Sequence, residues 1–278
     1  MTIKTILVCL TTAEATATLM KAAVPLARRL NAHLIGLHVI EPLVLYPGMA
    51  MDIPGGFYVD YNQSQEASAK VIKEIFEHAT RVEDFVSEWR LLNAGSATLA
   101  DRTVDSARAA DLVMMAQEQG TFGPRMDLVG HVIRSSGRPV LVIPQEYDGD
   151  GVMGENIMIG WSSTREAARA AHDLMLIAAD GATVGLICVG KTSGDDLNNH
   201  PANDMAASYD RHGLKAEVVH RLPGDQKVAE VLLDEAFARG VDLVVTGAFG
   251  HSRGYDLVIG AATSVLLESA TIPVLFSK

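Results

Sequence analysis

The sequence predicts an α/β fold in which two doubly wound domains, each with a parallel five-stranded sheet, follow one another along the chain. Three observations carry this prediction. The chain has 278 residues, more than one domain usually contains. Short, nearly continuous apolar runs alternate with segments of helical period, which is typical of a parallel sheet covered on both faces. The second half of the chain also repeats the first.

The repeat is clearest in the strand-like runs. Ile6-Leu7-Val8 starts one apolar run, and Ile157-Met158-Ile159 starts another 151 positions later. Two further pairs of segments match near the end of each half, namely 111–114 with 242–245 and 139–142 with 273–276. Each half is therefore predicted to be one copy of the same α/β unit.

The elements are expected in the same order in both halves. A Ser/Thr-rich turn follows the first strand and precedes an alanine-rich amphipathic helix, which we expect to end near Leu30 and near Ala179. Second strands are predicted over 34–40 and 182–189, and a later strand of the second half over 241–246. Further helices are predicted over 63–85, 226–238 and 263–270.

The first half carries extra residues in its middle, because the offset between the copies falls from 151 to about 131. We assign them to the segment 41–62, which is rich in Pro, Gly, Met and Tyr and is expected to be a long loop. Such a loop either covers a pocket as a lid or packs on the surface. We divide the chain into a first domain over 1–145, a linker over 146–155 and a second domain over 156–278.

Composition excludes several classes of protein. Apolar residues make up 48% of the chain, so a disordered acidic protein is excluded. The net charge of −11 argues against binding of nucleic acid, because no basic stripe offsets it. The densest basic stretch is the pair Arg28-Arg29, which we interpret as a solvated helix face. No apolar run approaches the roughly 18 residues of a membrane span.

Cysteine usage indicates a reducing compartment. Cys9 and Cys188 are the two cysteines of the chain, and both lie inside apolar, strand-like runs. The first ten residues read as a strand and not as a signal peptide, because no small-residue cleavage site follows them. We therefore expect a cytoplasmic protein.

Two motifs match patterns found in enzymes, but the residues around them do not fit those functions. Residues 185–192 match the phosphate-loop pattern G-x4-G-K-[ST], but the four central residues are the apolar core of a strand. Residues 250–254 match G-x-S-x-G, but no histidine follows Ser252 to complete a hydrolase triad. No His, Cys, Asp or Glu spacing typical of a metal site is present.

A glycine loop with the spacing G-x2-G-x9-G follows the strand predicted over 241–246. Its glycines are Gly247, Gly250 and Gly260, and a helical run begins just after the last of them. Glycines let a backbone approach a phosphate closely, and a helix N-terminus favours an anion. His251, Ser252 and Thr263 supply further donors. The same spacing also serves as a purely steric connection between strand and helix, so the pattern alone leaves both readings open.

The glycine loop, the closing strand 272–275 and the tandem repeat together resemble the universal stress protein family, in its two-domain form. The resemblance covers nearly the whole chain and implies the adenine-nucleotide-binding fold of that family. Members with this motif bind ATP, so the resemblance implies an ATP site on the second domain, with Mg2+ as an optional companion. The site residues that it implies are Trp161, Ser162, Val189, Thr246, Gly247, Gly250, His251, Ser252, Gly260, Ala261, Ala262 and Thr263.

The sequence departs from the family pattern at several positions. Ala261 lacks the hydroxyl that follows the last glycine in the family, and Ser162 stands where an Asp usually lies near the ribose and adenine. In the first half, Met126 replaces the last glycine, although Gly120 and Gly123 keep a G-x2-G, and Thr11 takes the Asp position. We therefore expect the first domain not to bind ATP in the manner of the family.

Three functions follow from these observations. The first is a stress-response or regulatory ATP-binding protein that is not an enzyme beyond very slow hydrolysis, because no lysine or Asp/His pair is placed for phosphoryl transfer. The second is an adaptor of the same fold that acts through an unknown protein partner or another small ligand. The third, an enzyme acting on a small molecule, finds no nucleophile or base. We expect the last strands, 140–143 and 274–276, to pair within the chain as a pseudo-dimer, while a further homodimer stays open.

Overall fold

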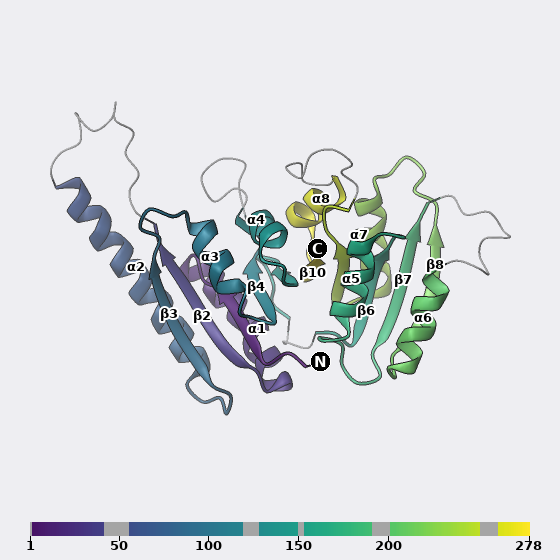
Figure 1. Ribbon diagram of the computed structural model, residues 1–278, viewed down its shortest axis with the longest axis horizontal. Coiled ribbons are helices and arrows are strands. Elements are labelled where there is room, and N and C mark those ends of the chain that lie inside the picture. The colour runs from purple at the N-terminus through teal and green to yellow at the C-terminus, as the bar shows by residue number, and fades with distance from the viewer. Residues whose placement is uncertain (1, 42–55, 119–127, 150–152, 191–200, 251–260) are drawn as a thin grey trace.

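The computed structural model describes residues 2–41, 56–118, 128–149, 153–190, 201–250 and 261–278 (Figure 1). Its strands form one ten-stranded sheet in the order β3-β2-β1-β4-β5-β10-β9-β6-β7-β8. Each half of this order is a doubly wound arrangement whose strand order reverses beside its first strand. The predicted fold class is thus confirmed, and the two five-stranded sheets are continuous with each other.

The first half supplies one end of the sheet, at the left of Figure 1. All its strand pairs are parallel. In chain order its elements are β1 (Thr5–Cys9), α1 (Ala13–Leu30), β2 (His33–Ile40), α2 (Phe57–Thr80), β3 (Ser87–Asn93), α3 (Leu99–Ala107), β4 (Leu112–Ala116), α4 (Leu128–Ser135) and β5 (Val140–Ile143).

The second half repeats this order at the other end of the sheet. Its strand pairs are again parallel. The elements are β6 (Asn156–Trp161), α5 (Arg165–Leu174), β7 (Thr183–Val189), α6 (Pro201–Arg211), β8 (Lys215–Arg221), α7 (Val228–Arg239), β9 (Leu243–Gly247), α8 (Ala261–Ser269) and β10 (Val274–Ser277).

Two apolar cores lie on the two faces of the sheet, and each runs through both halves. The first contains side chains of α1, α2, α5 and α6, and the second contains side chains of α3, α4, α7 and α8. The strands are buried on both sides between these helix layers, which explains why their sequences are apolar throughout instead of alternating.

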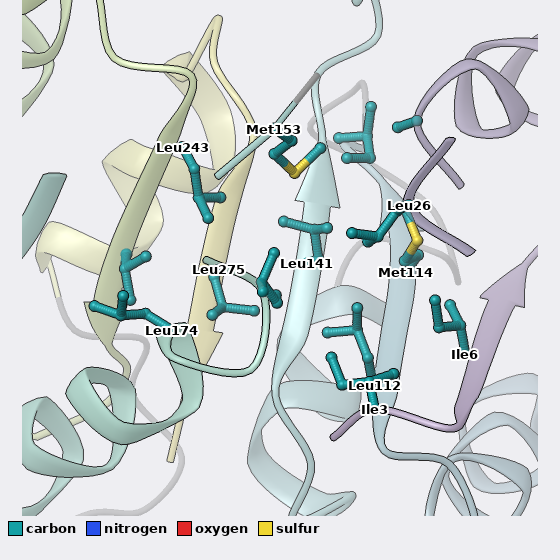
Figure 2. Close-up of a cluster of buried hydrophobic side chains, with 14 of the residues drawn as sticks. Ile3, Ile6, Leu26, Leu112, Met114, Leu141, Met153, Leu174, Leu243 and Leu275 are labelled. Carbon is teal, nitrogen blue, oxygen red and sulfur yellow. The ribbon is translucent and has the colours of Figure 1, made fainter. Parts of the chain in front are cut away.

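The halves meet where β5 pairs with β10, as expected from the sequence, and the structure shows that this pairing is antiparallel. Leu141 lies directly opposite Leu275, so these two residues occupy equivalent positions in the repeat. Figure 2 shows both side chains within one buried cluster that extends from Ile6 in β1 to Leu243 in β9. The pairing covers what would otherwise be two exposed edge strands.

Helix starts repeat along with the strands. Thr12 caps α1 by accepting from the Ala15 amide at 3.1 Å, and Thr164 caps α5 by accepting from the Ala167 amide at 3.2 Å. An aspartate beside the first strand also recurs. Asp111 accepts from the amides of residues 4 and 5, and Asp242 accepts from the amides of residues 154–156.

Several predicted boundaries need correction. The helix expected to reach Ala179 ends at Leu174, because residues 175–177 form tight turns in which the Ile177 amide donates to the Leu174 carbonyl. The segment expected to be a loop over 41–62 is helical from Phe57 onward, and its residues 42–55 lie outside the described residues. The strand predicted over 241–246 spans 243–247.

The interpretation of Arg28-Arg29 as a solvated face is wrong for Arg29. Its guanidinium donates to the carbonyls of Met153 and Ile177, which belong to the second half of the chain. Burial lowers the pKa of Arg29, against the raising effect of Asp242. Arg28 pairs with Glu83 at 2.7 Å. Arg29 is therefore a contact between the two halves. Among the described residues, no helix is long and apolar enough to cross a membrane.

Candidate functional site

Each half has one place where neighbouring strands send their connections to opposite faces of the sheet. In the second half this switch point lies between β6 and β9, and in the first half between β1 and β4. Ligands of doubly wound sheets bind outside the carboxyl ends of the strands at such points. The turn after β6 and the glycine loop after β9 therefore border the candidate site.

The turn after β6 is held by its own hydroxyl groups. The Ser162 hydroxyl lies 3.2 Å from that of Thr164, and the Thr164 amide donates to the Ser162 carbonyl at 2.8 Å. Ser162 is half-buried, so part of its surface faces the space at the strand ends. This is where the resemblance places the ribose and adenine.

Gly247 and Gly250 both face the first turn of α5, but they meet different atoms. A Cβ on Gly247 would lie 2.5 Å from the carbonyl carbon of Glu166 and 2.6 Å from the amide nitrogen of Ala167. A Cβ on Gly250 would meet only side-chain ends, at 3.0 Å from Glu166 Oε2 and 3.4 Å from Thr164 Oγ1. Close backbone packing thus requires the first glycine, whereas a side chain at the second would crowd only the side chains of Glu166 and Thr164.

Glu166 is the charged group of this site that the sequence did not single out. Its side chain is buried at 6% exposure and pairs with Arg165, Nε to Oε1, at 2.5 Å. Burial is the largest single effect and raises the pKa of Glu166, but the hydrogen bond from Arg165, a backbone hydrogen bond and the charges of Arg165 and Lys278 together outweigh it, so the pKa lies below its usual value. The carboxylate is therefore ionised at neutral pH. An acid in the first turn is an ordinary helix feature, so its role gave no signal in the sequence.

The other described site residues flank the turn and the loop. Thr246 is buried and donates its hydroxyl to the Gly247 carbonyl at 3.1 Å, so that donor is already used locally. Val189 is the half-buried last residue of β7. Trp161 ends β6, and its Nε1 is buried with no hydrogen-bond partner in the described part of the chain.

Phe249 ties the glycine loop to the first domain. Its backbone is left-handed, with φ of 64°, a conformation that a non-glycine residue adopts at a cost of roughly 1–3 kcal/mol. Its ring lies 5.1 Å from the Arg134 guanidinium carbon of α4 and 5.6 Å from Lys278 Nζ. A cation from the other half of the chain thus lies against the residue that precedes Gly250.

Helix α8 begins just after the glycine loop and is held at its far end by the first domain. Ala261, Ala262 and Thr263 form its first turn, and Thr263 is buried at 4% exposure. The Gln117 side chain donates to the carbonyls of Leu267 and Ala270 at 2.9 and 3.2 Å. Sequence reasoning did not find Gln117, because the contact joins residues about 150 positions apart.

Three predicted site residues, His251, Ser252 and Gly260, lie outside the described residues, as do Gly120, Gly123 and Met126 of the first domain. Their contributions stay predictions. The central residues of the phosphate-loop motif lie in a strand as predicted, because Leu186, Ile187 and Cys188 are buried inside β7, whereas the last two residues of the motif, 191 and 192, lie outside the described residues. No group of three potential metal ligands is found among the described residues either.

The matching strand ends of the first domain border two cavities. Toward α3 and α4, residues that include Leu99 and Leu128 enclose a cavity of only about 10 Å3, no more than one water requires. Toward α2, a larger cavity of about 470 Å3 is lined by Thr11, Thr12, Ala13 and His38 together with residues of that helix. The His38 ring is buried, with Nδ1 2.6 Å from the Leu10 carbonyl oxygen. In addition, the strand register places Ala116 where the second domain has Gly247, so the close approach of that glycine is lost.

Comparisons with known proteins identify the family and the fold. The model of the universal stress protein family matches the chain twice, over residues 2–144 and 153–278. A universal stress protein of Synechocystis sp. is 29% identical over 161 residues, or 56% of this chain and 52% of the relative. The matched part of the chain thus spans about half the length of that relative.

Solved structures share the fold. A universal stress protein from Archaeoglobus fulgidus has a TM-score of 0.74 at 13% identity, with 98% of this chain and 96% of that chain covered. A functionally unknown protein from Pseudomonas aeruginosa has a TM-score of 0.62 at 14% identity, with coverages of 99% and 92%.

Proposed function

Because the chain belongs to the universal stress protein family and carries two tandem family domains, we propose that it is a regulatory protein that binds ATP at its second domain without fast catalysis. The first domain then serves as a structural partner. The two free, buried cysteines support a cytoplasmic location.

The setting of Gly250 carries this proposal. It follows β9 at the switch point of the second domain, and a side chain there would crowd Thr164 and Glu166, which lie at the start of α5. Phosphates approach backbone amides most closely where side chains are absent. The buried Trp161 Nε1 and the Ser162 hydroxyl are polar groups near the strand ends that a ribose or adenine would contact.

The chemistry around the loop supports binding more than turnover. Glu166, the buried carboxylate beside Gly250, is already paired with Arg165 and does not accept a proton readily. Oxygen ligands for Mg2+ would come from the phosphates together with this carboxylate. A phosphate-release assay is expected to give turnover far below the ~1–1000 s⁻¹ of ordinary enzymes. ATP binding would then act by changing the conformation of the protein that its partners recognise.

A second candidate is an adaptor without ATP. One observation favours it: close packing against α5 is sufficient to explain why residue 247 is a glycine, without any ligand. In that case the glycine loop is a steric connection, and the chain acts through a protein partner.

Calorimetric titration of the purified protein with ATP, with and without Mg2+, separates the two candidates. Binding with saturation in the micromolar range supports the nucleotide-binding function, and absence of heat at high micromolar ATP favours the adaptor. Gly250→Val should abolish the binding, because its branched side chain enters the space beside Glu166 and Thr164. Gly123→Val is the matched control and should leave binding unchanged; loss of binding in this control would contradict the inactive first domain.

A further inference from the structure

We propose that the edge strand β3 is a self-association surface, through which two copies of the chain pair in antiparallel fashion about a two-fold axis at Trp89. The pairing joins the two ten-stranded sheets into one. This inference is independent of nucleotide binding, because β3 lies at the end of the sheet opposite to the second domain.

Strand β3 has one free edge. It is the terminal strand of the sheet and pairs only with β2 among the described residues (Figure 1). The Leu34 amide of β2 donates to the Val86 carbonyl at 2.9 Å. Because backbone groups alternate in direction along a strand, the amides and carbonyls of Ser87, Trp89 and Leu91 point to the free edge. Such an edge is a template for a further strand.

One face of β3 is left partly uncovered. Trp89 packs against the core on the side of α1 and α2, so the even-numbered residues point to the opposite side, where Leu92 packs against the other core. The helix of that side, α3, packs mainly on β1 and β2. Val86 therefore remains 67% exposed at the end of the strand.

Two opposite charges lie in the middle of this face. Glu88 and Arg90 have side-chain exposures of 39% and 32%, and Arg90 Nη2 lies 2.7 Å from Glu88 Oε1. Glu88 Oε2 lies 3.7 Å from His33 Nε2 of β2. From Val86 to Leu92 the face thus presents an apolar, an acidic, a basic and an apolar side chain, a pattern that is complementary to its own reverse.

An antiparallel partner centred on Trp89 uses this pattern in full. The two Trp89 residues then exchange both backbone hydrogen bonds. Glu88 lies opposite the partner's Arg90, and Val86 lies opposite the partner's Leu92, each twice because of the symmetry. These are non-hydrogen-bonded pairs, in which cross-strand side chains approach most closely. Opposite charges and apolar side chains stabilise such pairs.

The same charges disfavour the neighbouring registers. Moving the axis by one residue places Glu88 opposite the partner's Glu88, or Arg90 opposite the partner's Arg90, and like charges directly opposite are destabilising. The other edge strand, β8, lacks an equivalent pattern, because its Glu217 and Arg221 are held by the α7 side chains Arg239 and Glu235. Pairing of β3 with itself also closes the assembly at two copies.

Charge reversal tests the pairing. Sedimentation equilibrium of the full chain, from low to high micromolar concentration, should show a reversible dimer of the wild type. Glu88→Arg and Arg90→Glu each set like charges opposite each other in two symmetric pairs, so each should weaken dimerisation at least about tenfold. An equimolar mixture of the two variants should form the dimer again, because each chain then meets the opposite charge at both positions. Mixing cannot repair the internal pair of either chain, so recovery reports the contact between chains.

Glu217→Arg is the matched control, because it reverses an acidic residue on the other edge strand. It should dimerise like the wild type, and circular dichroism should show that all three variants are folded. A wild type that stays monomeric throughout the range overturns the proposal, as does a dimer that survives both single variants. Failure of the mixture to recover contradicts the register. Loss of the dimer in Glu217→Arg would mean that β3 pairs with β8 of the next copy, and the two-fold pairing would be wrong.

Discussion

At the scale of single residues, Gly247 and Gly250 belong to one motif but require glycine for different reasons. Gly247 packs against the backbone of α5, where neither the Glu166 carbonyl carbon nor the Ala167 nitrogen can move independently of the helix. Gly250 meets the end of a side chain that can shift. A sequence motif does not distinguish a glycine required for packing from a glycine that faces a ligand, because the residue is the same in both cases.

Gly247→Ala is expected to destabilise the protein by roughly 1–3 kcal/mol, the usual cost of forcing an extra carbon into a packed site. The added Cβ would lie 2.5 Å from a backbone carbon. Urea denaturation followed by circular dichroism measures the change. Gly250→Ala is the matched control and should cost less. Equal stability of Gly247→Ala and the wild type would show that the described packing is wrong.

Both cysteines should be inert in the folded protein. Burial raises the pKa of Cys9 to about 12 and that of Cys188 to about 11, so neither forms a thiolate at neutral pH. Ellman's reagent at pH 8 should modify neither thiol until guanidinium unfolds the chain, when both react. Rapid modification of either thiol in the native state would refute the assigned burial and leave room for a redox role.

At the scale of elements, the edge strand β8 is clamped to helix α7 by a carboxylate that two arginines share. Glu235 of α7 accepts from Arg221 of β8, with Nε to Oε1 at 2.5 Å, and from Arg239 Nε at 2.9 Å. Arg239 also pairs with Glu217 of β8. The hydrogen bond from Arg221 lowers the pKa of Glu235, against the raising effect of burial, and Arg239 lowers it further.

Glu235→Gln should therefore lower the free energy of unfolding at pH 7 by about 1.5–3 kcal/mol, the range for hydrogen bonds to a charged group. The folded pKa lies below the usual value of 4.5, so the carboxylate stabilises the fold fully above that pH. Its contribution falls as the pH drops through the folded pKa. Denaturation curves from pH 7 to 3 should show the variant and the wild type converging in acid; a gap that persists unchanged would contradict the clamp.

The elements themselves could be predicted largely from the repeat. The parallel strands are buried on both faces, and their apolar runs mark them even without an alignment. The end of α5 could not be placed, because residues 175–179 stay apolar while the backbone turns. The start of α2 at Phe57 was missed because aromatic and polar residues there resemble a loop in composition.

At the scale of the whole molecule, the two halves share their cores. Each apolar cluster contains residues from both halves, and β5 and β10 join the sheets through backbone hydrogen bonding. Arg29 and Gln117 add polar contacts across the same boundary. The chain is thus two repeats in sequence that share one sheet and two cores in structure.

Thermal unfolding should accordingly be a single transition. Differential scanning calorimetry is expected to give a ratio of calorimetric to van't Hoff enthalpy of about one. Leu275→Ala, at the junction of β5 and β10, should lower the free energy of unfolding by the roughly 2–5 kcal/mol typical of such a truncation. The unfolding temperature of the whole chain should fall with it. Two separate transitions, of which only the second shifts in Leu275→Ala, would mean that the halves unfold independently.

The side-chain contacts between the halves could not be predicted from the sequence, whereas the glycine loop could. The glycine spacing and the resemblance located the loop, and the switch point could be inferred from the strand order. Arg134 beside Phe249 and Gln117 beneath α8 could not be predicted, because they join distant residues without any local pattern. The burial of Glu166 is likewise a property of the packed structure alone.

The central claim is that one domain of the pair binds the nucleotide and the other does not. Equilibrium dialysis with labelled ATP and Mg2+ at saturating concentration measures this directly, as the number of nucleotides bound per chain. One per chain is the predicted result, because Ala116 stands in place of Gly247 and Met126 in place of Gly260 in the first domain. Two per chain would contradict the inactive first domain, and none would contradict nucleotide binding altogether.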